Sequence, residues 1–235
     1  MITLRRSGER HHDRRRKHEV WLTFDAKDRS DVLADGFGAL QVLDEDRLSP
    51  GGDLSRRPDR DAEIVIYVCG GALAYDDSTG RAGVIQAGEF RRTTAGHGRR
   101  QHETNASRSD WAHVFQIWLR ATQAAVDPRH EQKRFSTAER RGELCVVASP
   151  DARRGSLRLN QDAVLYSAML EPGRHVVHEL SPRRTAWLHI VQGDATLGDI
   201  VLSTGDGVGV TAERAVSLTA RVRTEILLLD LGERA

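Results

Sequence analysis

The stretch "AEIVIYVCGGALAYDDSTGRAGVIQAGEF", from Ala62 to Phe90, sets the fold of this chain. It begins with a β-branched run, turns at Gly70-Gly71, and continues with a second run in which apolar residues alternate with others. Later glycines bound a short Val/Ile strand. The pattern predicts a β-hairpin followed by a further strand in an all-β domain.

The pattern recurs in the second half of the chain. "HIVQGDATLGDIVLSTGDGVGV", from His189 to Val210, again runs from a strand through a glycine turn to a strand pair. Short strands with Gly- or Pro-containing turns also recur elsewhere at intervals of about 8–12 residues, which favours sandwiches or barrels over alternating βαβ units. This internal repeat predicts two similar jelly-roll β-barrels in tandem.

A polar connection separates the two predicted barrels. Residues 121–143, "ATQAAVDPRHEQKRFSTAERRGE", contain Pro128 and few apolar residues. We therefore expect an N-terminal barrel at residues 1–125, a linker at 126–143 and a C-terminal barrel at 144–235.

Composition limits the classes of function. The 235 residues carry a net charge of +1 and are 39% hydrophobic, which is typical of a globular protein and gives no reason to expect nucleic-acid binding. No apolar run approaches the roughly 18 residues of a membrane span. Cys69 and Cys145 are far apart, as expected in a reducing compartment, so we expect a cytoplasmic protein without a membrane partner. The basic run Arg10–His18 is interpreted as a solvated segment.

Several separated motifs follow the order of one known family. "GFGALQVLDEDRLSPG" (36–51) is followed by "RPDRDAEI" (57–64), where that family carries H-P-H-x-D-x-E-I. "QAGEFRRTTAGHGRRQHETN" (86–105) is similar to P-A-G-E-x-Q-x-M-x-A-G-x-G-x-x-H-S-E-x-N, and "FQIWL" and "PRHEQKRF" are similar to Q-I-W and P-x-Y-E-Q segments. Over nearly its whole length the chain resembles the pirin family, which implies an all-β bicupin fold.

The resemblance also implies a metal site and an activity. Family members hold an iron-type metal in the first barrel with three histidines and one glutamate. Some bacterial members are linked to oxidative opening of flavonols such as quercetin, and others to binding regulatory partner proteins. Carried onto this sequence, the ligand positions are Arg57, Asp59, Gln101 and Glu103, of which only Glu103 keeps the residue type.

The chemistry of these four positions argues against the family's metal centre. Residues two apart on a strand share a face, so all four side chains would point into one barrel. An arginine side chain offers only donors and cannot bind a metal, whereas a guanidinium at Arg57 could pair with Asp59 and Glu103. We therefore expect no cofactor at this site. One divalent, iron-type metal is the alternative.

Two histidines could rebuild a ligand set. His102 precedes Glu103, so a regular strand turns it away, whereas a bulge or a one-residue slip would turn it inward. His97 lies in a glycine-flanked turn. A set of Asp59, His97, His102 and Glu103 is therefore an alternative site. The histidines of the second barrel form no ligand motif and are predicted to have structural or surface roles.

Two functions follow from these observations. The main prediction is a pirin-like bicupin with a degenerate metal site that binds a small molecule or a partner protein in a regulatory role. The alternative is a metal-dependent oxidoreductase of the quercetin 2,3-dioxygenase type with a remodelled ligand set. Because three of the four ligands are replaced, the sequence leaves open whether the protein is an enzyme.

Overall fold

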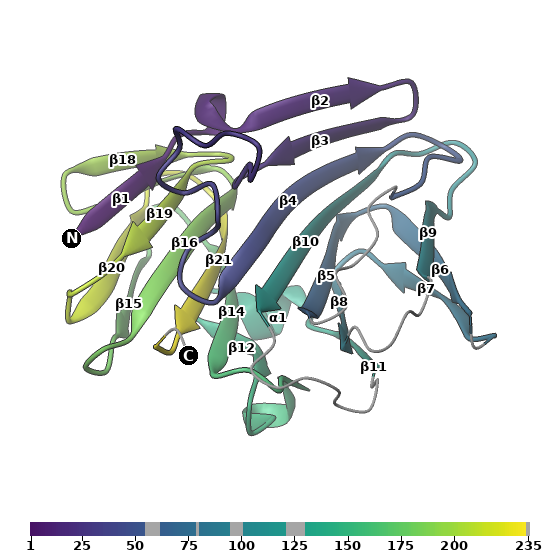
Figure 1. Cartoon of the computed structure of the whole chain (residues 1–235). Coiled ribbons are helices and arrows are strands. Elements are labelled where there is room, and N and C mark those ends of the chain that lie inside the picture. The colour runs from purple at the N-terminus through teal and green to yellow at the C-terminus, as the bar shows by residue number, and fades with distance from the viewer. Residues whose placement is uncertain (55–61, 79, 95–100, 121–129, 234–235) are drawn as a thin grey trace. The chain divides into compact units, whose positions relative to one another are not determined.

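The computed structural model describes residues 1–54, 62–78, 80–94, 101–120 and 130–233. Almost every element in these residues is a β-strand (Figure 1), which confirms the all-β prediction. The chain divides into two compact units, which we call the first barrel (His11–Gly36 and Leu40–Arg134) and the second barrel (Met1–Arg10, Phe37–Ala39 and Phe135–Ala235).

The first barrel consists of a large and a small antiparallel sheet. The large sheet has the order β11-β8-β5-β10-β4-β3-β2, with β2 (His11–Arg15), β3 (His18–Leu22), β4 (Leu40–Leu48), β5 (Ala62–Gly70), β8 (Glu89–Thr94), β10 (Ala112–Arg120) and β11 (His130–Arg134). The small sheet has the order β7-β6-β9, with β6 (Ala72–Asp77), β7 (Ala82–Gln86) and β9 (Gln101–Asn105).

The turn at Gly71 directs the chain from one sheet to the other. β5 and β6 lie in different sheets, so the hairpin predicted across this turn is wrong. Gly71 has a φ of +71°, and a Cβ atom there would lie 2.5 Å from the backbone oxygen of Trp111. Only glycine fits this left-handed, tightly packed turn.

One face of the large sheet forms the interior of the first barrel. Alternate residues of β5, β4 and β10 face the small sheet and build an apolar cluster. Its fully or nearly fully buried members include Leu48, Ile66, Val68, Leu73 and Val114. Polar side chains on this same face are therefore positioned by the sheet register.

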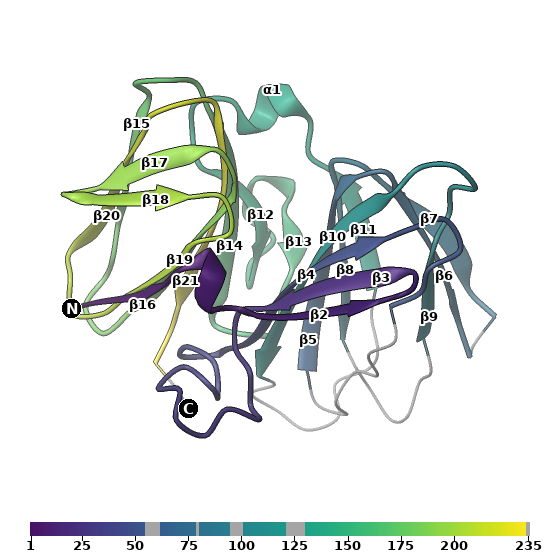
Figure 2. The ribbon, with the colours of Figure 1, turned by 90° about the horizontal axis from the view of Figure 1, so that it is seen from above.

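The second barrel repeats this arrangement. Its large sheet has the order β1-β19-β16-β21-β14-β12-β13, with β1 (Ile2–Arg5), β12 (Cys145–Ser149), β13 (Leu157–Arg158), β14 (Ala163–Leu170), β16 (Thr185–Gln192), β19 (Gly207–Val210) and β21 (Thr224–Leu231). The small sheet β15-β20-β17-β18 contains β15 (His175–Glu179), β17 (Asp194–Leu197), β18 (Ile200–Ser203) and β20 (Ala215–Ala220), and it faces the large sheet (Figure 2). Three short helices are described, η1 (Ser7–Glu9), α1 (Thr137–Arg140) and η2 (Arg153–Gly155).

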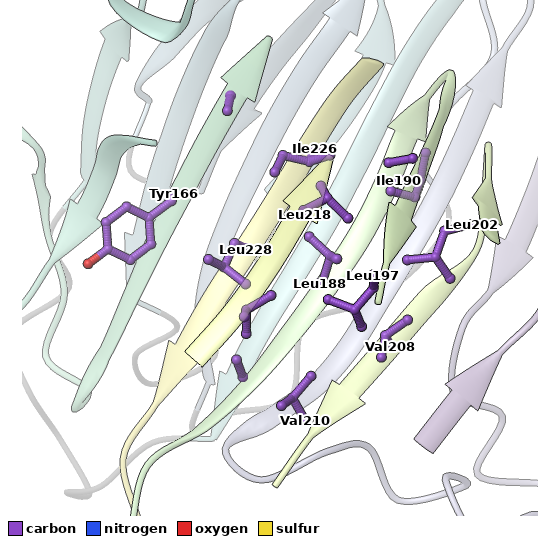
Figure 3. Packing of buried hydrophobic residues seen from close by; sticks show 14 of the residues in the cluster. Tyr166, Leu188, Ile190, Leu197, Leu202, Val208, Val210, Leu218, Ile226 and Leu228 are labelled. Atoms are coloured by element: carbon purple, nitrogen blue, oxygen red, sulfur yellow. The ribbon is translucent and has the colours of Figure 1, made fainter. Parts of the chain in front are cut away.

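The two barrels share one strand order, as the internal repeat predicts. β8-β5-β10-β4 in the first corresponds to β19-β16-β21-β14 in the second. Gly193, with a φ of +94°, makes the same crossing between sheets as Gly71. The interior of the second barrel is filled by aliphatic side chains such as Leu188, Ile190 and Leu228 (Figure 3). Each such side chain contributes about 2 kcal/mol through burial.

The unit boundaries differ from the expected ones. Residues 1–10 group with the second barrel, because β1 pairs with β19. Residues 37–39 belong to the same unit. Residues 126–129 of the expected linker lie outside the described residues, and its described part contains β11 and α1. β11 pairs in register with β8, and a Ser136–Glu139 capping box starts α1.

Within the described residues, no helix has the length and apolar character to cross a lipid bilayer.

Candidate functional site

Glu103 lies in the interior of the first barrel. It stands on β9 opposite Tyr75 of β6 and is only 6% exposed. Tyr75 packs against the apolar cluster of that barrel. This is the orientation expected for the one family ligand position that keeps its residue type.

His102, the neighbour of Glu103, faces the other way. Its side chain is 60% exposed, and its Nδ1 lies 3.4 Å from the carboxylate of Asp76. The pairing of β9 with β6 is regular, without the bulge or slip that would bring His102 beside Glu103.

The other predicted site residues lie beyond what the structure describes. Arg57, Asp59 and His97 fall in the segments outside the described residues, and Gln101 is described only as the first residue of β9. Their assignment as ligand positions stays a prediction. Among the described side chains, no three or more of the His, Cys, Asp and Glu type are grouped to hold a metal ion.

Arg91 supplies a guanidinium to Glu103. It stands on β8 opposite Ile66, faces the barrel interior and is 2% exposed. Its Nη1 lies 3.6 Å from a carboxylate oxygen of Glu103, and its guanidinium carbon lies 3.6 Å from the ring centroid of Tyr75. The 3.6 Å separation is an ion pair and is too long for a hydrogen bond.

Burial disfavours the charged form of both Glu103 and Arg91. Burial raises the pKa of Glu103, and the charge of Arg91 offsets only part of that rise. Burial likewise lowers the pKa of Arg91. The structure describes no hydrogen bond to the Glu103 carboxylate, and Nε and Nη1 of Arg91 have no hydrogen-bond partner among the described residues. A ligand or cation could therefore lower the energy of this buried pair.

Sequence reasoning expected an arginine–carboxylate cluster but did not identify Arg91. The cluster was expected to form around Arg57, which the structure does not describe. The signal for Arg91 was its strand parity: on β8 it shares the inward face of Ile66 on the neighbouring β5.

A cavity of about 430 Å³ opens on the same sheet of the first barrel. β3 and β2 extend the sheet beyond β4 (Figure 1), so the run Arg10–His18, interpreted as solvated, largely forms a paired strand. The register places the lining residues of β4 and β10 on the barrel's interior face, since Asp46 lies opposite Val114. The wall combines apolar and polar side chains, among them Val20, Leu22, Phe24, His18, Asp44, Asp46 and Gln116.

A chain of three polar side chains lines this cavity. Nε2 of His18 lies 2.6 Å from Oδ1 of Asp46, and Nε2 of Gln116 donates to the other oxygen of Asp46 at 2.9 Å. Asp46 is 1% exposed. Burial is the main cause of the raised pKa of Glu103, and the negative charge of Asp46 adds a minor part.

The interior of the second barrel holds a different polar group. Asp230 of β21 contacts His178 at 2.8 Å and accepts a hydrogen bond from Arg184 at 2.5 Å, and Arg184 also pairs with Asp162 at 2.8 Å. Burial opposes ionisation of Asp230, but these hydrogen bonds and charges outweigh it and lower its pKa. The contacts of His178 agree with its predicted structural role.

Comparison with known proteins gives matches over almost the whole chain. Residues 4–119 match the family model described as pirin, and residues 146–231 match the quercetinase C-terminal cupin domain. The chain is 36% identical to the quercetin 2,3-dioxygenase of Escherichia coli strain K12 over 231 residues, which cover 98% of this chain and 99% of the relative. A pirin-like protein of Caulobacter vibrioides is 29% identical over 83% of this chain and 84% of its own length.

Solved structures agree. The crystal structure of YhhW from E. coli superposes with a TM-score of 0.93 at 36% identity, covering 99% of this chain and 98% of that one. A second crystal structure of the same bacterial pirin, in complex with nickel(II), superposes with a TM-score of 0.91 and covers 99% of this chain and all of the other. These matches confirm the predicted fold of two cupin barrels.

The expectation that the family site takes no cofactor is contradicted by the nickel(II) complex of this relative, whose chain superposes over its whole length. The expectation rested on the missing imidazoles at three of the four family positions. Glu103, however, is buried without a described hydrogen bond, which leaves a carboxylate able to bind a cation.

Proposed function

The chain belongs to the pirin family of bicupin proteins, and from that premise we propose that it is a metal-dependent oxidoreductase of the quercetin 2,3-dioxygenase type with a remodelled ligand set. The relatives named above support this activity over a purely binding role. The regulatory protein partner considered from the sequence stays a prediction.

The observation that carries the proposal is the buried carboxylate of Glu103. It lies at the family's glutamate position, points into the barrel and is matched by a guanidinium only at 3.6 Å. A carboxylate oxygen is a suitable ligand for a divalent metal of the iron or nickel type. Burial raises the pKa of Glu103, so metal binding to this carboxylate competes with its protonation.

The remaining ligands in this proposal come from the neighbouring sequence positions. By residue type, Asp59 and Gln101 would offer oxygen donors and His97 an imidazole nitrogen. His102 is left out because its side chain faces solvent. A metal ion bound there would polarise the oxygen atoms of a flavonol and allow its oxidation by O₂.

Arg91 has a defined task in this proposal. In the metal-free protein its positive charge compensates the negative charge of Glu103 next to the apolar cluster of the first barrel. Stacking on Tyr75 holds the guanidinium in place. When a cation binds Glu103, Arg91 opposes it, so we expect weaker metal binding than an all-imidazole site would give.

Oxygen uptake with quercetin tests the proposed activity. The full-length protein, loaded with nickel(II) or iron(II), should consume O₂ with quercetin, lose this activity on chelation and recover it on reloading. Glu103→Gln should lose it, whereas Asp76→Asn, on the solvent-exposed side of the same strand pair, should retain it. Turnover that survives both chelation and Glu103→Gln would refute a metal-dependent activity at this site.

A cytoplasmic location forms part of the same proposal. Cys69 and Cys145 are the two cysteines of the chain and lie far apart in the sequence without CxxC spacing, as expected in a reducing compartment.

A further inference from the structure

The His18–Asp46–Gln116 chain has the geometry of an oriented imidazole base. Both oxygens of Asp46 are engaged, one by His18 at 2.6 Å and one by Gln116 at 2.9 Å. A carboxylate can only accept hydrogen bonds, so the proton of a neutral His18 imidazole lies on Nε2. Nδ1 then carries the lone pair and is free to accept a proton.

Nδ1 of His18 faces no partner in the part of the chain that the structure describes. The contacts of this imidazole engage Nε2 alone, and the side chain is 13% exposed at the wall of the cavity. Asp46 is 1% exposed and held on its far side by Gln116, so it fixes the ring's tautomer and orientation.

The cavity wall has two chemically different parts. Val20, Leu22 and Phe24 are apolar, while the oxygen atoms of Asp44 and Asp46 lie on the strand next to β3. An aromatic molecule that carries hydroxyl groups matches this combination, because its ring would contact the apolar part and its hydroxyls would donate to the acceptors. The cavity volume of about 430 Å³ is within the range of small-molecule sites.

We infer that His18, oriented by Asp46, accepts the proton of a phenolic or enolic hydroxyl group bound in this cavity. The inference rests on the proposed function for its substrate class. In this step the O–H bond of the ligand breaks, an N–H bond forms at Nδ1 of His18, and the electron pair stays on the ligand oxygen. The imidazolium that results faces the negative charge of Asp46.

Other charged groups line the same cavity and bear on this proton transfer. Asp13 and Arg15 of β2 pair with each other at 3.2 Å, and His11 lies 3.7 Å from Asp25. The remaining charged groups are Asp44 and Lys27. The cavity wall thus carries the cations Arg15 and Lys27 and four carboxylates, those of Asp13, Asp25, Asp44 and Asp46.

Ionisation of a bound flavonol in the metal-free protein tests the inference. Ionised flavonols absorb at longer wavelength than neutral ones, so titrating quercetin at a pH below its own pKa reports the ionised fraction directly. With the wild type we expect the band of the ionised form. In His18→Gln and Asp46→Asn the ionised fraction should fall on the order of tenfold while quercetin still binds.

The first barrel offers a matched control. His113 of β10 contacts Glu45 of β4 at 2.8 Å, so it forms the same kind of histidine–carboxylate pair with the neighbouring residue of β4. Residues 45 and 113 alternate with those that face the cavity. His113→Gln should therefore leave the ionised fraction unchanged. The Asp46→Asn variant also separates chemistry from shape, because its amide would donate to Nε2 and move the proton to Nδ1.

The outcomes separate this inference from the proposed function. Ionised quercetin in the wild-type protein, lost in both variants, supports the base even if the metal-loaded protein shows no turnover. If wild type and His18→Gln turn over quercetin with equal kcat and ionise it to the same extent, His18 is not the base. That result would leave the proposed dioxygenase activity unaffected. A wild-type protein that does not bind quercetin, or that binds only the neutral form, also overturns it.

Discussion

The two barrels share a strand order but treat a buried carboxylate in opposite ways. In the first, Glu103 is buried beside Arg91 at 3.6 Å, and burial raises its pKa. In the second, Asp230 receives close contacts from His178 and Arg184, which outweigh burial and lower its pKa. The satisfied carboxylate stabilises its barrel, whereas the poorly satisfied one is available to a cation.

Restoring the family's imidazoles in the first barrel should give the largest effect, a gain in metal affinity that the second barrel does not share. The triple variant Arg57→His, Asp59→His, Gln101→His replaces a cation and two oxygen donors by imidazoles at the family's ligand positions. We expect nickel(II) affinity to rise on the order of 1,000-fold, about 4 kcal/mol. Isothermal titration of both proteins measures it. An unchanged affinity in a folded triple variant would show that the barrel interior has itself diverged.

Breaking the satisfied carboxylate should cost stability in the second barrel. Asp230→Asn leaves Arg184 and His178 without their charged partner, which we expect to lower the free energy of unfolding by about 3 kcal/mol. Urea unfolding measures it. Asp162→Asn is the control, because Asp162 binds the same arginine but is 66% exposed, and it should cost less than about 1 kcal/mol. Equal losses in the two variants would contradict the comparison.

Removing the positive charge of Arg91 should increase the affinity of the first barrel for a cation. The family motif quoted above carries glutamine at the position of Arg91. Arg91→Gln removes a buried positive charge near Glu103, so nickel(II) should bind about tenfold more tightly. The same titration measures it, with Arg92→Gln as the control, because Arg92 pairs with Glu63 on the opposite face of the sheet. Weaker binding in Arg91→Gln would assign Arg91 a supporting role in the metal site.

The smallest expected effect is a pH dependence. Because the folded-state pKa of Asp230 is lowered, its contribution to stability is complete above the ordinary aspartate pKa and is lost as the pH falls through the folded value. The stability difference between wild type and Asp230→Asn should therefore shrink on acidification below about pH 4. Urea unfolding across acidic pH measures it. A difference that stays constant would mean that Asp230 is not ionised in the folded protein.

Sequence and structure agree where the signal is local. Glycine turns and β-branched runs identify the strands, and parity along β9 places Glu103 inward and His102 outward. The internal repeat likewise identifies two barrels of one strand order.

Features that depend on pairing between distant strands were missed. Arg91 meets Glu103 only because β8 and β9 face each other from different sheets. His18 meets Asp46 only because the β2–β3 hairpin extends the large sheet, and the charged run around it reads as solvated. Sheet register is non-local, so one sequence does not determine such contacts.

Nickel(II) stoichiometry tests the central claim, that Glu103 anchors a metal in the first barrel, most directly. At saturating nickel(II) we predict about one bound ion per wild-type chain, the same in Asp76→Asn, and none at this site in Glu103→Gln. Equal binding by wild type and Glu103→Gln would show that Glu103 does not hold the metal and would contradict the account.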